Sequence, residues 1–231
     1  CIRDRYDYKY KLLFDTVRTQ PSDPIAKVGL PLALNFYELI PFWYTFFCDL
    51  GFETVLSEES SRQTYYKGQH TIASDTVCYP AKLMHGHIES LLEKNVDFIF
   101  YPCMSYSYNL DEGETDNHYN CPVVAYYPEL LKANMSKLND ENFIYPYIDM
   151  NRTKSSIKTI YKVLSERYPS ITKKHVAQAF EHAFSLFHSY HKHIRQEGEK
   201  IIAKARAEKK KIIVLAGRPY HIDPEINHGI H

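Results

Sequence analysis

The fold class is decided by residues 27–57, which read KVGLPLALNFYELIPFWYTFFCDLGFETVLS. A short β-rich run at 28–34 precedes an apolar segment of helical length at about 38–50, and a second β-rich run follows at 52–57. Pro31 places the first run at a strand end or edge. Short strands separated by helix-sized segments are typical of a parallel sheet that is covered by helices on both faces.

The same alternation continues towards the middle of the chain. Residues 80–95 are predicted to form a helix, with a proline in its first turn. The run 97–101 predicts a strand, and residues 122–126 predict another one ahead of a short helix at 128–135. We therefore expect a three-layer α/β domain with a mostly parallel, doubly wound sheet of about four strands, joined by right-handed crossovers.

The last third of the sequence changes to helical periodicity. Helices are predicted over 153–168 and over 172–210. In the second helix, apolar side chains recur every seven residues at Phe180, Phe187, Ile194 and Ile201. A helix of that length with one apolar stripe packs along a domain or bridges two. The run 209–217 then predicts a buried strand, because it is rich in β-branched residues.

These patterns predict three regions along the chain. Residues 1–150 are expected to form an α/β domain that carries the cysteines, and residues 151–210 a long-helix segment. Residues 211–231 are expected to begin a second α/β domain, which would be truncated here.

Composition limits the class of protein. The 231 residues include 44% hydrophobic side chains, which is enough for a substantial core. The 28 basic and 28 acidic side chains balance, which argues against nucleic acid as the main partner. No apolar stretch approaches the roughly 20 residues of a membrane span, and no secretory signal is evident. An odd count of 5 cysteines fits reduced thiols, so we expect a soluble cytoplasmic chain.

Three cysteines occupy related places in the predicted fold. Cys78 directly precedes a predicted helix, Cys103 follows a strand, and Cys121 stands at the entry to the next predicted element. Loops at the carboxyl ends of parallel strands converge on a crevice where ligands bind. Three thiolates from separate loops can hold zinc or an iron–sulfur cluster with one coordination position left open. Three unrelated buried thiols are the alternative, and Cys48 is expected in the core.

Several sequence strings carry a resemblance to a known family. They are NFYE (35–38) with PFWYTFF (41–47), CYPAKLMHGH (78–87), FYPC (100–103), DNHYNCP (116–122) and AGRPYHIDP (216–224). These strings resemble the domain found in large proteins related to the activator of 2-hydroxyacyl-CoA dehydratases. That uncharacterised domain is itself similar to the dehydratase subunits, and the resemblance covers nearly the whole chain.

The resemblance implies a cofactor and partners. In the dehydratase subunits, three cysteines hold a [4Fe–4S] cluster with one iron open to water or substrate, and an ATP-dependent activator supplies one electron. Cys78, Cys103 and Cys121 lie inside the matching motifs, so the resemblance implies that they are the ligands of a 4Fe-4S module. It also implies an activase domain or protein as partner and an acyl-CoA as substrate. The activator's Gly-rich phosphate loops are not recognisable in this sequence. Whether the chain is an enzyme and whether it forms a homodimer stay open.

Three polar residues near the cysteines are further candidates. His85 and His118 are placed to hydrogen-bond cluster sulfides or to complete a zinc site, and Lys82 to pair with a CoA phosphate or a carboxylate. A packing or surface role is the alternative for each. Because His85 and His87 are two residues apart, they are not expected to share a helix face. The rival function is a non-catalytic scaffold or regulatory module whose crevice binds a CoA-like ligand or a partner protein.

Overall fold

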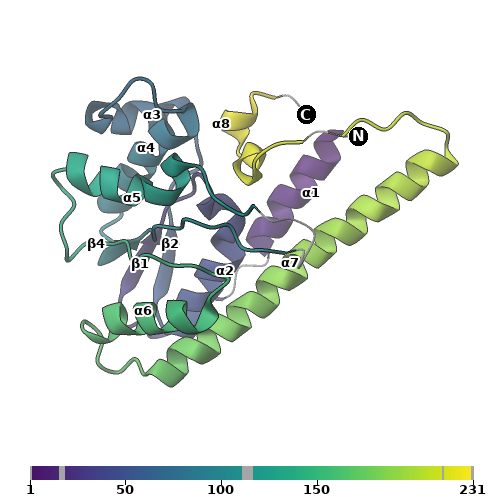
Figure 1. The fold of residues 1–231 in the computed structure, drawn as a ribbon. Coiled ribbons are helices and arrows are strands. Elements are labelled where there is room, and N and C mark those ends of the chain that lie inside the picture. Colours follow the sequence, from purple (N-terminus) through teal and green to yellow (C-terminus); the bar gives the residue numbers. More distant parts are fainter. Residues whose placement is uncertain (1, 16–18, 111–116, 215, 230–231) are drawn as a thin grey trace.

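The computed structural model describes residues 2–15, 19–110, 117–214 and 216–229. Its centre is a four-stranded sheet in the order β2-β1-β3-β4, and every neighbouring pair is parallel. The strands are β1 (Lys27–Leu30), β2 (Glu53–Leu56), β3 (Phe98–Phe100) and β4 (Phe143–Ile144). Helices cover both faces of the sheet (Figure 1), which confirms the predicted three-layer α/β fold.

The helices divide between the two faces. They are α1 (Ile2–Asp15), α2 (Phe36–Asp49), α3 (Arg62–Gly68), η1 (Gln69–Thr71), α4 (Tyr79–Glu93), α5 (Pro122–Asn134), α6 (Thr153–Ser165), α7 (Lys173–Ala207), η2 (Pro219–Ile222) and α8 (Pro224–Asn227). Helices α2 and α7 lie together on one side of the sheet, and α3, α4 and α5 lie on the other (Figure 1). The chain reverses its winding direction after β2, because β3 pairs with the other side of β1.

Successive residues of the central strands face opposite layers. The rings of Phe98 and Phe100 lie 6.2 Å and 4.9 Å from the ring of Phe47 on α2, measured between centroids. On the other face, Gly29 of β1 lies under α4, where an added Cβ would stand 3.1 Å from the side chain of Leu91. The small residue therefore lets α4 pack close to the middle of the sheet.

The first half of the long helix α7 packs in the core, and its second half extends beyond the sheet. Thr172 caps it by accepting a hydrogen bond from the His175 backbone N–H at 3.2 Å. In its first half, Phe180 is fully buried, and its ring centroid lies 5.0 Å from that of Phe42 on α2. Its second half extends beyond the sheet (Figure 1). Although α7 is long, no helix in the described residues is apolar enough to cross a membrane.

One predicted strand is wrong. Residues 122–126 form the first turns of α5 and not a strand, and α5 continues through the helix predicted at 128–135. Cys121 stands at the N-cap, and Pro122 occupies the first turn, where its missing N–H costs no hydrogen bond. The cap and the proline therefore outweigh the β-propensity of the valines and tyrosines that follow.

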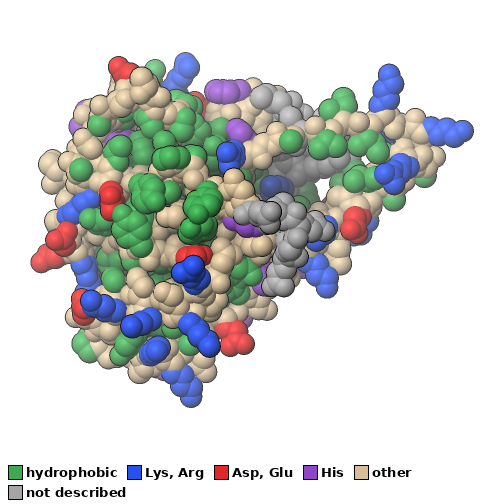
Figure 2. All heavy atoms as spheres, viewed as in Figure 1, with side chains coloured by type: hydrophobic (Ala, Val, Ile, Leu, Met, Phe, Trp, Pro, Cys, Tyr) green, Lys and Arg blue, Asp and Glu red, His purple; other side chains and the backbone are tan. Residues whose placement is uncertain are grey.

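The strand predicted at 209–217 is also wrong. Its described residues pair with no strand, and the side chains of Ile213 and Val214 are 76% and 83% exposed. Figure 2 shows hydrophobic side chains along this connection after α7. Residues 219–227 then pack back onto the cysteine-bearing unit, where Ile222 and Ile226 are buried. A second domain that begins near residue 211 stays a prediction.

Several short or polar elements were not predicted. They are α1, α3 with η1, the two-residue strand β4, and the four-residue helices η2 and α8. Charged and polar residues obscure the helical period in the first two, and a two-residue strand is too short to show any period.

Candidate functional site

Two of the three cysteines begin helices at the carboxyl edge of the sheet. Cys78 is the N-cap of α4 and Cys121 the N-cap of α5, with nearly identical backbone angles of φ −63°, ψ 151° and φ −62°, ψ 152°. A proline follows in the first turn of each helix, and both cysteines are exposed. Each cysteine therefore stands at the partially positive end of a helix, a position that suits an anionic ligand of a metal.

Cys103 differs because it is buried behind the same edge. It follows β3, and its backbone extends the sheet by accepting from the Ile148 N–H and donating to the Pro146 carbonyl, each at 2.9 Å. Burial, together with the nearby Glu129 carboxylate, raises the pKa of its thiol to about 11. Without a cation beside it, this thiol stays protonated at neutral pH.

Tyr101 connects Cys103 with Cys121. Burial raises the pKa of its phenol well above the ordinary value, and the electrostatic influence of the Cys103, Tyr127 and Cys121 side chains raises it further. Both thiols therefore influence the same phenol electrostatically. The Tyr101 hydroxyl oxygen is itself buried and has no hydrogen-bond partner within the described parts of the chain. An unsatisfied buried hydroxyl costs about 1–3 kcal/mol.

Tyr220 and Tyr127 bring Cys78 into the same neighbourhood. Burial raises the pKa of Tyr220, and the electrostatic influence of the Cys78 and Cys121 side chains adds to the effect. Burial and then Cys78 likewise raise the pKa of Tyr127. Each of the three cysteines thus influences at least one of these tyrosines electrostatically. The tyrosines come from the residue after β3, from α5 and from η2, so only the folded chain reveals this relation.

His85 lies behind this set and is fully hydrogen-bonded. Its Nδ1 lies 2.7 Å from the Thr71 hydroxyl, and its Nε2 lies 2.9 Å from the Tyr127 hydroxyl. Since Thr71 donates its proton to the Gly68 carbonyl, the imidazole donates from Nδ1 and accepts from Tyr127 at Nε2. Burial lowers its pKa to about 4, so the ring is neutral. The ring of His85 orients Tyr127, which in turn lies near Cys78.

His87 takes part in a second buried network that sequence analysis missed. Its Nδ1 lies 2.8 Å from the Ser57 hydroxyl and its Nε2 lies 3.0 Å from the Ser60 hydroxyl. Ser60 donates to the buried Asp223 carboxylate. Burial lowers the pKa of His87 to about 3 and raises that of Asp223 to about 6. This network ties the C-terminal segment to α4.

The other two predicted candidates contact groups other than the thiols. The Lys82 ammonium donates to the Asp75 carbonyl at 2.8 Å and so fixes the loop that leads to Cys78. His118 lines a separate depression with Tyr106 and Arg152. Cys1 and Asp116, the latter being the first residue of the DNHYNCP string, lie outside the residues that the structure describes.

A single-ion site is not formed at this edge. Across the residues that the structure describes, no group of three or more His, Cys, Asp or Glu side chains is close enough to hold one metal ion. A zinc site needs sulfur and nitrogen atoms at about 2.0–2.3 Å from one ion. The alternative of a zinc ion completed by His85 or His118 is therefore not supported, and His85 uses both ring nitrogens elsewhere.

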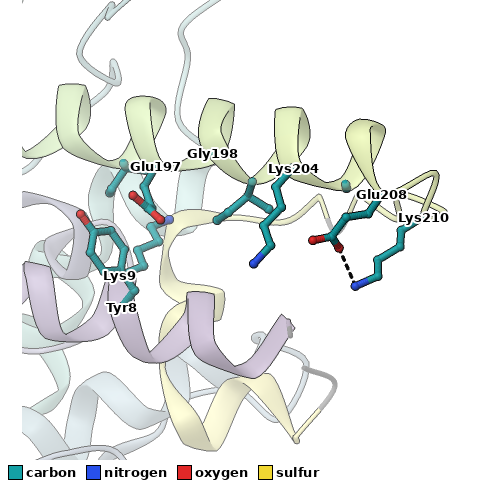
Figure 3. Close-up of a pocket in the computed structure, with 10 residues that line it drawn as sticks. Tyr8, Lys9, Glu197, Gly198, Lys204, Glu208 and Lys210 are labelled. Atoms are coloured by element: carbon teal, nitrogen blue, oxygen red, sulfur yellow. Dashed lines mark ion pairs between the residues drawn. The ribbon is translucent and has the colours of Figure 1, made fainter.

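One groove of the molecule lies away from the cysteines. It has a volume of about 530 Å³ and runs between α1 and the second half of α7 (Figure 3). Tyr8 and Lys9 line one side, and Glu197 and Lys204 line the other. None of the residues that line it comes from the cysteine-bearing loops. The volume of a pocket therefore does not identify the candidate functional site.

Comparison with known proteins identifies a family. Residues 27–231 match the family model described as CoA enzyme activase uncharacterised domain (DUF2229). No curated protein matches the chain, and no solved structure matches it. The matched region includes Cys78, Cys103 and Cys121.

Proposed function

Because the chain belongs to the CoA enzyme activase uncharacterised domain family, we propose that it is an iron–sulfur module of a 2-hydroxyacyl-CoA dehydratase- or activase-related electron-transfer system. Cys78, Cys103 and Cys121 would hold a [4Fe–4S] cluster through three thiolates. When bound, such a cluster would supply one-electron chemistry at an iron that no protein ligand occupies.

The observation that carries the proposal is the Tyr101 hydroxyl. It is buried without a partner among the described residues, and its phenol lies within the electrostatic influence of Cys103 and Cys121. A cluster sulfide held by these cysteines would accept its hydrogen bond. A cluster is also wider than one ion, so its ligands need not converge as closely as those of zinc.

The environments of the three thiols support the same proposal. Cys78 and Cys121 stand at helix N-termini, whose partial positive charge suits the anionic ligands of a cluster. Cys103 is buried with a raised pKa, so it would ionise only as it binds a cation. We propose that electrons arrive from an ATP-dependent activase domain or protein and that an acyl-CoA is the substrate. The homodimer and the cytoplasmic location belong to the same proposal.

Anaerobic reconstitution tests the cluster. Purified chain incubated with iron and sulfide is expected to bind about four iron and four sulfide atoms per chain, or per dimer if two chains share a cluster. Replacing Cys78, Cys103 or Cys121 by serine should lower both contents by more than half. The matched control is Cys48→Ser, since Cys48 lies on α2, where its thiol contacts the Thr54 hydroxyl at 3.5 Å.

Two outcomes would count against the cluster. One is a folded wild-type chain that takes up neither iron nor sulfide. The other is a Cys78→Ser variant with the iron content and electron paramagnetic resonance spectrum of the wild type. Either result would favour the non-catalytic scaffold or regulatory module, whose crevice needs no thiolate.

A further inference from the structure

The groove between α1 and the second half of α7 has an apolar floor with heptad spacing. Four positions of α7 form this floor, which we call the α7 stripe: Ile194, Gly198, Ile201 and Ala205. Steps of four, three and four residues are the spacing with which one helix packs along another. Phe187 and Phe180, one and two heptads before Ile194, are buried in the core. The stripe therefore continues a packing face beyond the part of the molecule that covers it.

The stripe is incompletely covered within one chain. A Cβ built on Gly198 would meet no atom within 4 Å, so the glycine faces open space. The neighbouring Ile202 is 40% exposed, which adds apolar surface beside the stripe. Glycine inside a helix costs about 1 kcal/mol relative to alanine, and no close contact within the described residues accounts for it here. The open glycine leaves room for the close approach of another helix.

Two opposite charges flank the stripe on the same side. Glu197 and Lys204 both line the groove and point into it (Figure 3). They are seven residues apart, so they occupy the same heptad position next to the stripe. The Glu197 carboxylate lies 3.2 Å from the Lys200 ammonium, whose side chain is 74% exposed. Because such a surface ion pair contributes at most about 1 kcal/mol, Glu197 can also pair with a cation on a second helix.

The stripe is complementary to a second copy of itself that runs antiparallel. With the twofold axis between residues 199 and 200, Gly198 lies opposite Ile201 of the second copy, and Ala205 lies opposite its Ile194. Each large side chain then meets a small one, which is how facing helix positions interdigitate. The twofold axis repeats each of these contacts, so the stripe is filled along its whole length.

The flanking charges select this register and this direction. Glu197 then lies opposite Lys204 of the second copy, and symmetry forms the pair twice. A shift of one heptad in either direction would place Glu197 opposite Glu197, or Lys204 opposite Lys204. A parallel pair would set Lys204 against Lys209 and glycine against glycine, which leaves a gap in the core. Like charges across an interface suppress such alternatives.

We propose that the α7 stripe binds a second copy of this chain, with the two long helices antiparallel and Glu197 of each paired with Lys204 of the other. Tyr8 and Lys9 of α1 form the opposite wall of the groove, so the helix of the second copy lies between α7 and α1. The inference rests on the homodimer of the proposed function and names its surface. It does not depend on the cluster, because none of the residues that line the groove is a cysteine.

Light scattering of the reduced, iron-free chain over a range of concentrations tests the interface by measuring the dissociation constant of the dimer. Glu197→Lys and Lys204→Glu should each weaken the dimer about tenfold or more, because each sets like charges against one another twice. The double variant restores opposite charges, so its dissociation constant should return to within about threefold of wild type. The matched control is Glu181→Lys, which makes the same charge change at an exposed position on the first half of α7, outside the groove.

Three results would overturn the proposal. The first is a wild-type chain that stays monomeric at every concentration. The second is a double variant that dissociates as readily as the single variants, which would mean that Glu197 and Lys204 do not face each other. The third is a Glu181→Lys variant that dissociates as readily as Glu197→Lys, which would indicate an effect of overall charge. Circular dichroism of each variant shows whether the helices remain formed. Because the measurement uses iron-free chain, a failed cluster reconstitution leaves its result readable.

Discussion

Gly86 determines how close two helices come. A Cβ at Gly86 would overlap the backbone oxygen of Thr64 on α3, and one at Gly68 would overlap the backbone of α4. The two helices therefore cross at a pair of glycines. The sequence places Gly86 between His85 and His87, which are buried on either side of this crossing. The expectation that the two histidines face different directions is confirmed by their separate partners.

Replacing Gly86 by alanine should destabilise the protein. The added methyl group meets backbone and not a flexible side chain, so we expect a loss of about 2–3 kcal/mol or more in the free energy of unfolding. Gly198→Ala is the control, because a Cβ at Gly198 meets nothing within 4 Å and alanine favours a helix interior by about 1 kcal/mol. Urea denaturation measures both. Equal stability of the Gly86→Ala variant and the wild type would contradict the close crossing.

At the scale of an element, α4 depends on two neutral histidines. Burial lowers the pKa of His85 to about 4 and that of His87 to about 3, from an unfolded value of 6.5. The unfolded chain therefore binds protons below pH 6.5 that the folded chain does not, and stability falls as the pH drops towards 4. Asp223 has the opposite effect on stability. Because its pKa in the folded chain is raised to about 6, the folded chain takes up a proton below that pH more readily than the unfolded chain does.

Replacing His85 by glutamine should make this pH dependence shallower. Glutamine does not titrate, so the slope of unfolding free energy against pH should fall by up to about 1.4 kcal/mol per pH unit between pH 6 and 4. The exposed His175 on the first turn of α7 serves as control, and His175→Gln should keep the wild-type slope. Thermal or urea unfolding at several pH values gives both slopes. Identical slopes for the two variants would show that His85 is not held neutral.

The sequence predicts most of the elements because their periods are strong. The elements β1, α2, β2, α4, β3 and α7 lie where apolar periodicity and helix caps place them. The strand predicted at 122–126 failed because valine and tyrosine have β-propensity, while the proline and the cap act over only one turn. The strand predicted at 209–217 failed because apolar composition cannot show whether a neighbouring strand exists to pair with it.

At the scale of the whole molecule, the sequence predicts that the three cysteines lie at the carboxyl edge of the sheet, but it does not predict which side chains from other parts of the chain surround them. The helix caps and strand ends bring Cys78, Cys103 and Cys121 to the carboxyl edge. The shared neighbours Tyr101 and Tyr220 come from distant parts of the chain, and long-range packing of this kind leaves no periodic signal. Nor could the buried Asp223 be expected next to Ser60, 163 residues away in sequence.

The exposed connection after α7 should make the chain associate with itself. Ile213 and Val214 are 76% and 83% exposed, and contiguous exposed apolar residues favour association. Replacing both by lysine should lower the apparent mass in light scattering and leave the unfolding free energy within about 0.5 kcal/mol of wild type. Ser185→Lys with Gln196→Lys on the exposed side of α7 makes the same charge change and is the control. A folded double variant with wild-type apparent mass would contradict the prediction.

The attachment of the C-terminal segment has a consequence for the thiols. Tyr79, next to Cys78, donates a hydrogen bond to Glu225 at 2.8 Å, and Ser60 donates to Asp223. Tyr220 from the same segment lies near both Cys78 and Cys121. The C-terminal segment is therefore fixed in place beside the exposed thiols of Cys78 and Cys121. If this segment detached, Cys78 and Cys121 would lose a neighbouring phenol and become more accessible to dioxygen. The rate at which these thiols oxidise should therefore depend on whether the segment is packed in place.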